Sequence, residues 1–375
     1  MSFAECILRE DEKAVYKLRE LYGSYGYMKY KVSKFEEYDL YAKNKNFLVS
    51  DNLLTFTDTN GKLMALKPDV TLSIIKNVVA NEKATYKVCY DEKVYRTTSS
   101  GDGFREIMQT GLETIGNIDS FAQSEVVMLA MKSLKNISED YILDISNMRF
   151  LEGLFENAGI DTDYVSDMLS LIGSKNIPAI KAFCAKLGLS DASTEKICKV
   201  ASLYMPIKDA LLVIAPLVEG KKMNAAYKEL EEIYSVMCAY DLAEKLYVDF
   251  SIVNDMNYYD GIIFKGFING IFDSVLSGGR YDRLMDKFGK NMQAIGFAVY
   301  LDRLERLSSE IKPYDVDDLL VYDTELGAEQ IISAVEALKK EGNSVRAVSC
   351  PDKSLRYKKL VKLGKDGLES LEEND

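Results

Sequence analysis

The sequence contains no histidine, and this absence removes a whole class of chemistry. Without an imidazole there is no Ser-His-Asp triad, no Cys-His pair, no histidine general base and no histidine metal ligand. Any binding or catalysis must therefore rely on carboxylates, arginines, lysines and tyrosines. The chain is well supplied with the last of these, because 24 of its 375 residues are tyrosine.

Cysteine is also scarce, and long apolar runs are missing. The six cysteines are scattered without the paired spacing of metal ligands, so we expect neither a disulfide framework nor a metal site. No apolar run is long enough to span a bilayer, and Met1-Ser2-Phe3 does not begin a signal peptide. We therefore expect a cytoplasmic protein that has no membrane contact.

The composition that remains is that of an acidic globular protein. A chain of 375 residues exceeds what one hydrophobic core usually serves, so we expect two or three domains. The net charge of −12 argues against a strongly basic nucleic-acid surface, although it leaves room for a local positive groove.

The N-terminal part mixes helical and strand patterns. An apolar stripe predicts a helix from about Glu10 to Tyr25, and residues 27–32 read as a strand. Two strand-like runs between residues 53 and 66 flank a turn-rich tetrapeptide, which predicts a hairpin.

A strand-to-helix junction follows at Lys67-Pro68-Asp69. Pro68 forces its predecessor out of the helical region, and a helix continues toward Val79. Asp69 or Thr71 can cap this helix, but a polar side chain at such a junction is equally well placed to bind a ligand. The pattern leaves both roles open.

Residues 86–116 predict a long antiparallel hairpin with a polar tip. In a strand Arg105, Gln109 and Glu113 project to the same side, and Gly111 between them would leave room for a ligand. A helix would also align them, because they are spaced four apart. The alternative is a solvent-facing polar edge of the sheet, which any half-buried strand can present.

The stretch from Val253 to Leu304 predicts a second hairpin about a two-residue Asn269-Gly270 turn. The adjacent glycines at 278–279 then read as a loop leading into a helical pattern that ends on Arg303. Such a loop and arginine could hold a nucleotide. The alternatives are an ordinary glycine turn and a solvated arginine near a helix end.

Two further regions have their own patterns. Residues 147–247 form a run of helical patterns interrupted by glycines and prolines. A β-α-β-α unit is predicted after Pro313, with a strand at 319–322, a helix at 328–340, a strand at 345–349 and a final basic stretch at 353–365.

Taken together, these segments resemble the catalytic core of class II histidyl-tRNA synthetases. The motifs that carry the resemblance are, in chain order, YDEKVYR ending on Arg96, FREIMQTGLETIG, NYYDGIIF, SGGRYD and IGFAVYLDRL. The resemblance implies an α+β fold with a class II aminoacyl-tRNA synthetase-like antiparallel sheet flanked by helices, a helical insertion and a shortened α/β C-terminal domain. It implies a core at 1–146 and 248–312, an insertion at 147–247 and a C-terminal domain at 313–375.

The resemblance also implies roles for single residues. Arg96 would contact the ATP α-phosphate and Arg303 the far phosphates, which suits the bidentate fit of guanidinium to phosphate oxygens, and Arg105 would belong to the same nucleotide pocket. The histidine-binding residues would be Asp69 and Thr71 at the amino group, with Gln109, Glu113, Tyr258 and Tyr259 around the amino acid and its imidazole.

Two departures from the synthetase pattern bear on function. Active synthetases of this type place an arginine before the paired tyrosines, in an Arg-Gly-Leu-Asp-Tyr-Tyr pattern, whereas this chain has Asn254 followed by Asp255. Losing one donor aimed at developing charge costs ~10²–10³ in rate, so we expect adenylation to be crippled. The synthetases also carry Arg-Pro-Glu where this chain has Lys-Pro-Asp69, while their non-catalytic relatives, the regulatory subunits of short-form ATP phosphoribosyltransferase, often carry Arg-Pro-Asp.

We therefore expect a regulatory subunit with no catalytic residue and no required cofactor. The partners implied by the resemblance are the catalytic subunit of ATP phosphoribosyltransferase, a second copy of the chain and L-histidine. One alternative is an authentic histidyl-tRNA synthetase that uses Mg-ATP, in which Lys67, Arg105 or another cation replaces the missing arginine. Another is a tRNA-binding or amino-acid-sensing scaffold, although the shortened C-terminal domain weakens the case for tRNA.

Overall fold

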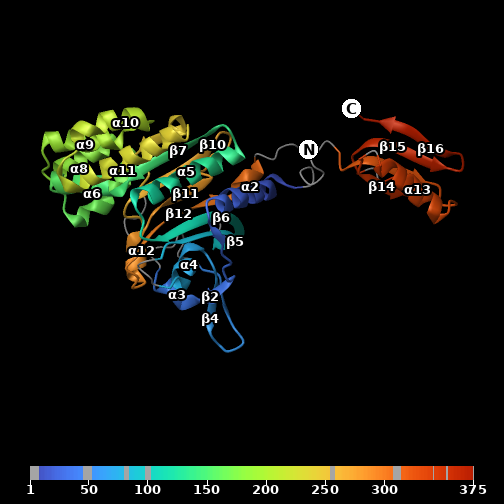
Figure 1. Cartoon of the computed structure of the whole chain (residues 1–375), viewed down its shortest axis with the longest axis horizontal. Coiled ribbons are helices and arrows are strands. Elements are labelled where there is room, and N and C mark those ends of the chain that lie inside the picture. Colours follow the sequence, from blue (N-terminus) through green and yellow to red (C-terminus); the bar gives the residue numbers. More distant parts are fainter. Residues whose placement is uncertain are drawn as a thin grey trace. The chain divides into compact units, whose positions relative to one another are not determined.

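The computed structural model describes residues 8–44, 53–79, 84–97, 103–253, 258–306, 314–340, 342–351 and 354–374. The chain forms two compact units, Met1–Leu307 and Ser308–Asp375 (Figure 1). Within the described residues, no helix is both long and apolar enough to cross a membrane.

The larger unit is built on a nine-stranded sheet whose central strands run antiparallel. Parallel pairs flank them, β1 with β5 at one side and β7 with β9 at the other. In spatial order the strands are β1 (Met28–Lys29), β5 (Tyr86–Thr97), β6 (Phe104–Gly116), β12 (Gln293–Tyr300), β11 (Leu276–Arg280), β10 (Ile262–Ile268), β7 (Tyr141–Asn147), β9 (Leu246–Asp249) and β8 (Tyr204–Pro206).

Two helices cover one face of this sheet, α2 (Glu10–Ser24) and α5 (Ser120–Ile137) (Figure 1). Their apolar stripes pack on Leu112, Phe264 and Phe297 of the sheet in one large core. Tyr22 of α2, for example, meets Phe297 edge to face at 5.9 Å between ring centroids. The predicted N-terminal helix is confirmed as α2. Because α2 and α5 cover this face of the sheet, other elements of the core pack on the opposite face.

The opposite face carries a second core and a small three-stranded sheet. This sheet consists of β2 (Phe35–Glu37), β4 (Leu63–Leu66) and β3 (Thr55–Thr57), with α3 (Tyr38–Ala42) and α4 (Thr71–Asn77) beside it. The predicted hairpin between residues 53 and 66 is confirmed as β3 and β4. Its turn is fixed by Asp58, whose carboxylate accepts hydrogen bonds from the backbone of Asn60 and Lys62, both at 2.8 Å.

The long hairpin is confirmed as β5 and β6. Its register sets Tyr90 opposite Gly111 and Arg96 opposite Arg105. Residues 98–102, where the polar tip is predicted, lie outside the described residues.

The second hairpin is confirmed as β10 and β11. A turn forms at Asn269-Gly270, where the Ile271 N–H donates to the Ile268 carbonyl at 3.1 Å and Gly270 has a φ of 87°, but this turn alone does not join the two strands. β10 ends at Ile268 and β11 begins at Leu276. Asn269 is bonded to the residue that precedes β7, because its backbone N–H and its side-chain amide donate to Asp140 at 3.0 and 2.8 Å. The chain then crosses a longer connection, in which Ile271 is buried, before β11 begins.

The predicted glycine loop and the helix ending on Arg303 are wrong. Gly278 and Gly279 lie inside β11, where a Cβ atom would come within 2.4 Å of the Gly296 carbonyl oxygen and 2.7 Å of the Tyr259 ring respectively. Close packing of strands and side chains, rather than a turn, requires these glycines. The rest of the segment is α12 (Asp282–Lys287), strand β12 and a 3₁₀ helix, η5 (Leu301–Arg306).

The region between β7 and β9 is mainly helical, although β8 from within it joins the sheet. Asn147 begins the first of its helices by accepting hydrogen bonds from the backbone of Arg149 and Phe150. The α-helices are α6 (Met148–Ala158), α7 (Val165–Gly173), α8 (Ile177–Lys186), α9 (Asp191–Ala201), α10 (Ile207–Ile214) and α11 (Gly220–Ala239). Three 3₁₀ helices accompany them, η2 (Thr162–Tyr164), η3 (Ala215–Leu217) and η4 (Ala243–Lys245).

The smaller unit is a four-stranded sheet in the order β14-β13-β15-β16, and its described residues contain one α-helix. A second helix over the basic stretch, as the β-α-β-α pattern predicts, is wrong. Val361 and Leu363 alternate onto the core with Leu338 of the helix, so the stretch has the period of a strand. The elements are β13 (Val316–Tyr322), α13 (Ala328–Lys339), β14 (Val345–Val348), β15 (Tyr357–Gly364) and β16 (Gly367–Glu373).

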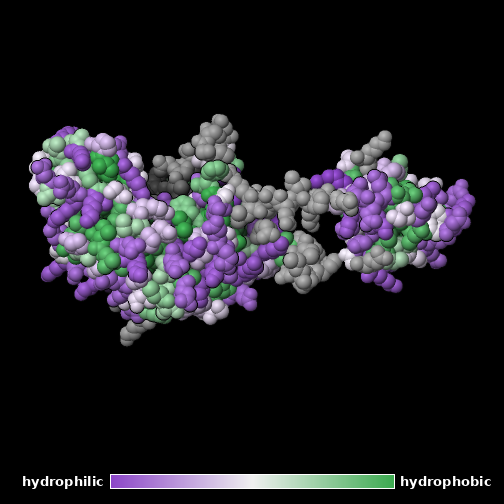
Figure 2. Space-filling model, turned by 90° about the horizontal axis from the view of Figure 1, so that it is seen from above, coloured by the Kyte–Doolittle hydropathy of each residue, from purple (hydrophilic) through white to green (hydrophobic). Residues whose placement is uncertain are grey.

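Exposed large apolar side chains are spread along both units, for example Leu212, Phe272 and Ile332. The face seen in Figure 2 is a mosaic of hydrophilic and hydrophobic areas. Scattered apolar residues of this kind are normal at a protein surface.

Candidate functional site

The candidate site lies on the sheet face opposite α2 and α5. Strand alternation puts Arg105, Gln109 and Glu113 of β6 on this face, opposite Arg96, Glu92 and Val88 of β5. Gln109 and Glu113 are buried, whereas Arg105 is exposed. The three residues therefore share a face, but they sit in two different environments.

Glu113 is the centre of the buried part. Thr71 Oγ1 donates to its Oε1 at 2.8 Å, and the Tyr281 hydroxyl donates to its Oε2 at 2.5 Å. The carboxylate lies against β12 at Gly296, where a Cβ atom would be only 1.7 Å from Oε2. Only glycine at this position admits the carboxylate.

The electrostatics of this carboxylate are unusual. Burial raises the pKa of Glu113 to about 8, and the hydrogen bonds from Tyr281 and Thr71 oppose that shift without cancelling it. Asp69 nearby adds a further small increase. Glu113 can therefore change its protonation state near neutral pH, which suits recognition of a cationic or hydrogen-bonding ligand.

Aromatic rings enclose this carboxylate. Tyr258 and Tyr259 pack edge to face at 4.5 Å between centroids, and Tyr258 lies 6.0 Å from the Tyr281 ring. Burial raises the pKa of all three phenols well above its usual value, so they remain neutral hydrogen-bonding groups. Tyr258 also hydrogen-bonds with Thr71, which joins the paired tyrosines to the group around Glu113.

Asp69 has the capping role that the sequence allows. Its Oδ1 accepts a hydrogen bond from the Leu72 backbone at 2.9 Å, at the start of α4. Burial raises the pKa of Asp69, while the Leu72 N–H and the nearby Arg96 oppose the increase. Arg96 is oriented by a bond of 3.1 Å from its Nε to the Pro68 carbonyl. The bond from Leu72 uses Oδ1 of the Asp69 carboxylate, so capping does not exclude a ligand contact at this side chain.

Gln109 is 3% exposed, and its Nε2 has no hydrogen-bond partner among the described residues. Leaving a buried amide donor unsatisfied costs about 1–3 kcal/mol. The cost is avoided if a ligand or an ordered water accepts from Nε2, so this atom is a candidate ligand contact.

The arginines of the implied nucleotide pocket are placed differently. The Arg105 side chain is 56% exposed and only reaches Asp302 at 3.9 Å. Arg303 donates to the Ser274 carbonyl oxygen, and its guanidinium lies 4.5 Å from the centroid of the Tyr300 ring. Arg303 is therefore engaged by the protein itself.

Three contributors are missed by the sequence analysis, namely Tyr281, Tyr90 and Glu92. Tyr281 belongs to the SGGRYD motif, so the signal was present but assigned to a loop. The expected ligand space at Gly111 is wrong, because a Cβ there would lie 2.7 Å from the Tyr90 hydroxyl, which fills the space. Glu92 has no local signal that predicts its partner.

That partner is Lys67, the least exposed cation of the site. Its side chain is fully buried, and its Nζ lies 2.5 Å from Glu92 Oε2. Glu92 Oε1 also accepts from the Val32 backbone at 3.1 Å. The charge of Lys67 is thus neutralised within the fold.

Asn254, where the sequence analysis expects the synthetase arginine to be lost, lies outside the described residues. Among the residues that are described, no cluster of three or more carboxylate or thiol side chains is arranged to hold a metal ion.

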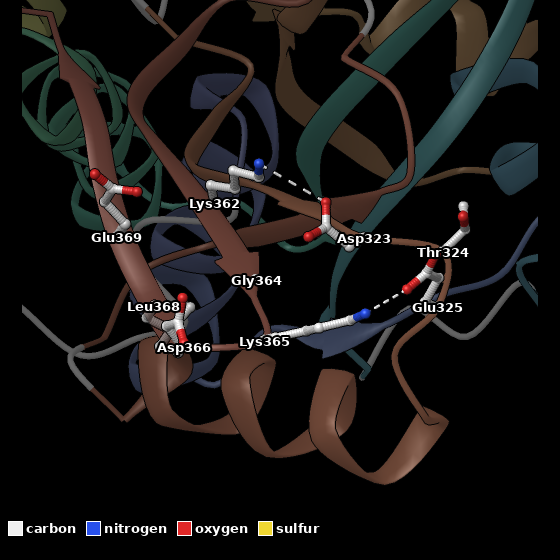
Figure 3. Close-up of a pocket in the computed structure, with 10 residues that line it drawn as sticks. Asp323, Thr324, Glu325, Lys362, Gly364, Lys365, Asp366, Leu368 and Glu369 are labelled. Carbon is white, nitrogen blue, oxygen red and sulfur yellow. Dashed lines mark ion pairs between the residues drawn. The ribbon is translucent and has the colours of Figure 1, made fainter.

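The smaller unit contains a surface hollow of about 680 Å³ beside the β15–β16 turn. Figure 3 shows two ion pairs across it, Lys362 to Asp323 at 3.8 Å and Lys365 to Glu325 at 2.6 Å. Asp366 and Glu369 add further carboxylates to the lining. Since carboxylates outnumber ammonium groups, this lining disfavours phosphate ligands.

Sequence comparison identifies two kinds of related protein. The family model of histidyl-tRNA synthetase matches residues 7–304. An ATP phosphoribosyltransferase regulatory subunit from Ruminiclostridium cellulolyticum is 26% identical over 100% of this chain and 90% of its own length. The one from Alkaliphilus metalliredigens is 30% identical over 77% of this chain and 74% of its own length.

Structural comparison confirms the class II synthetase-like α+β fold. An ATP phosphoribosyltransferase regulatory subunit/histidyl-tRNA synthetase from Bacillus halodurans has a TM-score of 0.75 at 23% identity, covering 92% of this chain and 90% of that chain. A chain of the ATP phosphoribosyl transferase (HisG:HisZ) complex from Thermotoga maritima has a TM-score of 0.62 at 19% identity, covering 78% and 97%. At these identities the likeness concerns the fold alone.

Proposed function

The chain belongs to the histidyl-tRNA synthetase family and, within it, to the regulatory subunits of ATP phosphoribosyltransferase, and from this premise we propose that it activates the catalytic subunit of that enzyme and takes part in its feedback control by histidine. It acts without a cofactor and without chemistry of its own. Its place is the cytoplasm, where histidine biosynthesis takes place.

The arrangement of side chains around Glu113 is the observation that supports histidine binding. A buried carboxylate held by Thr71 and Tyr281, with the unsatisfied amide of Gln109 on the same face, offers partners for both the ammonium and the imidazole of histidine. Tyr258 and Tyr259 supply aromatic walls. Keeping an acid buried in this way costs stability, which supports a binding role rather than a structural one.

The alternative of an active synthetase requires a free cation in place of the missing arginine. Lys67 is neutralised by Glu92, and Arg303 is engaged by Ser274 and Tyr300. Arg105 stands at the exposed rim. These contacts support a pocket that binds the amino acid but does not activate it.

The scaffold alternative requires a surface for tRNA. In residues 308–375 acidic residues outnumber basic ones, and the hollow of Figure 3 has a predominantly acidic lining. Both features oppose phosphate binding. Copurification of tRNA that is lost steeply with added salt would favour this alternative instead.

The partners follow from the same premise. The chain pairs with a second copy through its synthetase-like core and with the catalytic subunit in a larger complex. Feedback by histidine requires unequal affinity for the active and inactive states of that complex, because a ligand with equal affinity for both shifts nothing.

Reconstitution tests this proposal. Purified short-form catalytic subunit is assayed with ATP and its phosphoribosyl donor, alone and with this chain. We expect the chain to raise turnover and histidine to lower it, while Glu113→Gln activates normally but no longer responds to histidine. A surface variant, Lys196→Gln, serves as the matched control. Unchanged turnover on mixing folded proteins would contradict the proposal.

A further inference from the structure

The segment that follows the paired tyrosines is clamped between two elements. The backbone N–H of Asp260 donates to the Arg280 carbonyl at the end of β11, at 3.1 Å. The Gly261 carbonyl accepts from the Met148 N–H at the start of α6, at 2.9 Å. The backbone is thus held by the sheet on one side and by the insertion on the other.

Arg149, the second residue of α6, adds a side-chain link to the same segment. Its Nε donates to the Asp260 carbonyl at 2.9 Å. Its Nη1 donates to Glu229 of α11 at 3.1 Å, and its Nη2 lies 3.6 Å from Asp282 of α12. Asn147 donates to the other oxygen of Glu229 at 2.8 Å. One guanidinium therefore joins two insertion helices to the residue after the tyrosines.

The Asp260 side chain is bonded to α12, whereas its backbone carbonyl is bonded to Arg149 of α6. Its carboxylate accepts from the backbone of Arg283 at 2.7 Å and of Asp282 at 3.3 Å, at the start of α12. Burial raises the pKa of Asp260 and Asp282 raises it further, while the hydrogen bond from the Arg283 backbone and, after it, the charge of Arg149 oppose the increase. The network has its hydrogen bonds satisfied, so displacing the backbone of Asp260 would disturb several bonds together.

The tyrosines have little freedom to absorb such a displacement. The Tyr259 ring lies so close to Gly279 that a Cβ atom there would be 2.7 Å from it. Tyr258 is tied to Thr71, which in turn donates to Glu113. A shift of α6 or α11 transmitted through Arg149 would therefore reach the carboxylate at the centre of the pocket.

We propose that Arg149 is a positioning residue for the amino-acid pocket, through which the helical insertion and the occupancy of the pocket influence each other. The inference rests on the proposed function, because it takes histidine as the ligand of the pocket. Anything that displaces α6 or α11, including a protein bound to the insertion, changes the affinity for histidine. By linkage, histidine changes the affinity for that protein by the same factor.

Three variants separate this role from simple support of the fold. Arg149→Lys keeps a cation near Glu229 but removes the Nε donor and the planar fork that bonds Asp260 and Glu229 together. Arg149→Met removes the charge as well. Lys222→Gln is the matched control, because Lys222 of α11 pairs with Glu152 and Glu156 of α6 on the surface, without contacting Asp260.

The first measurement is amide hydrogen exchange on the full chain without ligand. We expect Arg149→Lys to speed exchange at Asp260 and Met148, whose N–H groups form the clamp, while the remaining amides and the melting temperature stay near wild type. The second measurement is calorimetric titration with histidine, in which we expect both Arg149 variants to bind about tenfold more weakly, within the usual range of coupling. The Lys222→Gln control should match wild type in both.

Two results would overturn the inference. One is wild-type exchange and wild-type affinity in both Arg149 variants. The other is faster exchange throughout the unit with a lower melting temperature, which would mean that Arg149 only supports the fold. If the wild type itself binds no histidine, the proposed ligand is wrong, and exchange at Asp260 and Met148 still decides whether Arg149 holds the segment.

Discussion

The two halves of the pocket are built in opposite ways. In the amino-acid half, Glu113 is buried and receives hydrogen bonds from Thr71 and Tyr281. In the nucleotide half, Arg105 is exposed and Arg303 is engaged by a backbone carbonyl and a tyrosine ring. The first half keeps a carboxyl group buried at a cost in stability, whereas in the second half Arg303 is bonded within the protein and Arg105 is exposed.

Under the proposed function, this contrast fits a chain that binds an amino acid without activating it. Binding of an amino acid needs a shaped and preorganised pocket, whereas its activation also needs cations aimed at phosphates and at developing charge. A chain that keeps the first and lacks the second can sense histidine without consuming ATP.

The largest effect is expected where the two halves meet, at the buried Lys67–Glu92 pair. Lys67→Met leaves Glu92 without its cation, and breaking a buried pair from one side costs about 3–5 kcal/mol. Urea unfolding measures this loss. The double variant Lys67→Met with Glu92→Leu should recover much of it, because neither charge remains unpaired. Equal stability of the single and double variants would show that the pair is not buried as described.

The next effect concerns the amino-acid half. Glu113→Gln weakens the bonds from Thr71 and Tyr281 and removes the carboxyl group that the cation of a bound histidine would ionise, so we expect histidine affinity to fall about 100-fold, on the order of a charged hydrogen bond. Glu125→Gln, which alters a buried carboxylate paired with Lys87 of β5, is the control and should bind normally. Titration calorimetry measures the affinity of both variants for histidine. Near wild-type affinity in Glu113→Gln would show that histidine does not bind at Glu113.

The buried acid also predicts how stability depends on pH. The pKa of Glu113 is raised from 4.5 to about 8, so the folded state binds more protons than the unfolded state between those values. The free energy of unfolding should therefore fall as pH rises through this window, by up to about 1.4 kcal/mol per pH unit.

Glu113→Gln should flatten this slope, measured by urea unfolding at several pH values. Asp144, whose pKa burial raises to about 7, contributes with the same sign, so Asp144→Asn should flatten only the part below its pKa. An unchanged slope in both variants would mean that these carboxyls ionise normally in the folded protein.

The smallest effect is expected in the nucleotide half. Arg105→Gln removes an exposed side chain that reaches Asp302 only at 3.9 Å. Exposed pairs contribute about 0–1 kcal/mol, so stability and histidine affinity should both stay near wild type. The same unfolding and titration assays measure them. A tenfold loss of histidine affinity would show that the two halves act as one site.

Sequence patterns predict the parts of the site that lie on regular strands. A period of two is enough to place Gln109 and Glu113 on one face. The polar residues after the proline offer Asp69 or Thr71 as a cap, and the structure shows Asp69 accepting from the Leu72 backbone. Patterns fail where a distant contact decides the structure. Gly278 and Gly279 look like a loop, but their neighbours are a carbonyl of β12 and a tyrosine ring, which no local window contains.

The same limit explains the missed partners. Tyr281 meets Glu113 across 168 positions of sequence, and Lys67 meets Glu92 across 25. The clamp at Asp260 joins residues more than 100 positions apart. Only the folded sheet and the packing of the insertion bring such pairs together.

Histidine-dependent ATP–pyrophosphate exchange with magnesium, measured beside an Asn254→Arg variant, tests the contrast between the two halves most directly. We expect no exchange by the wild type, together with a rise in melting temperature on adding histidine, because a ligand that binds only the folded state stabilises it. Exchange by the wild type at an ordinary synthetase rate would contradict it and make the chain an aminoacylating enzyme.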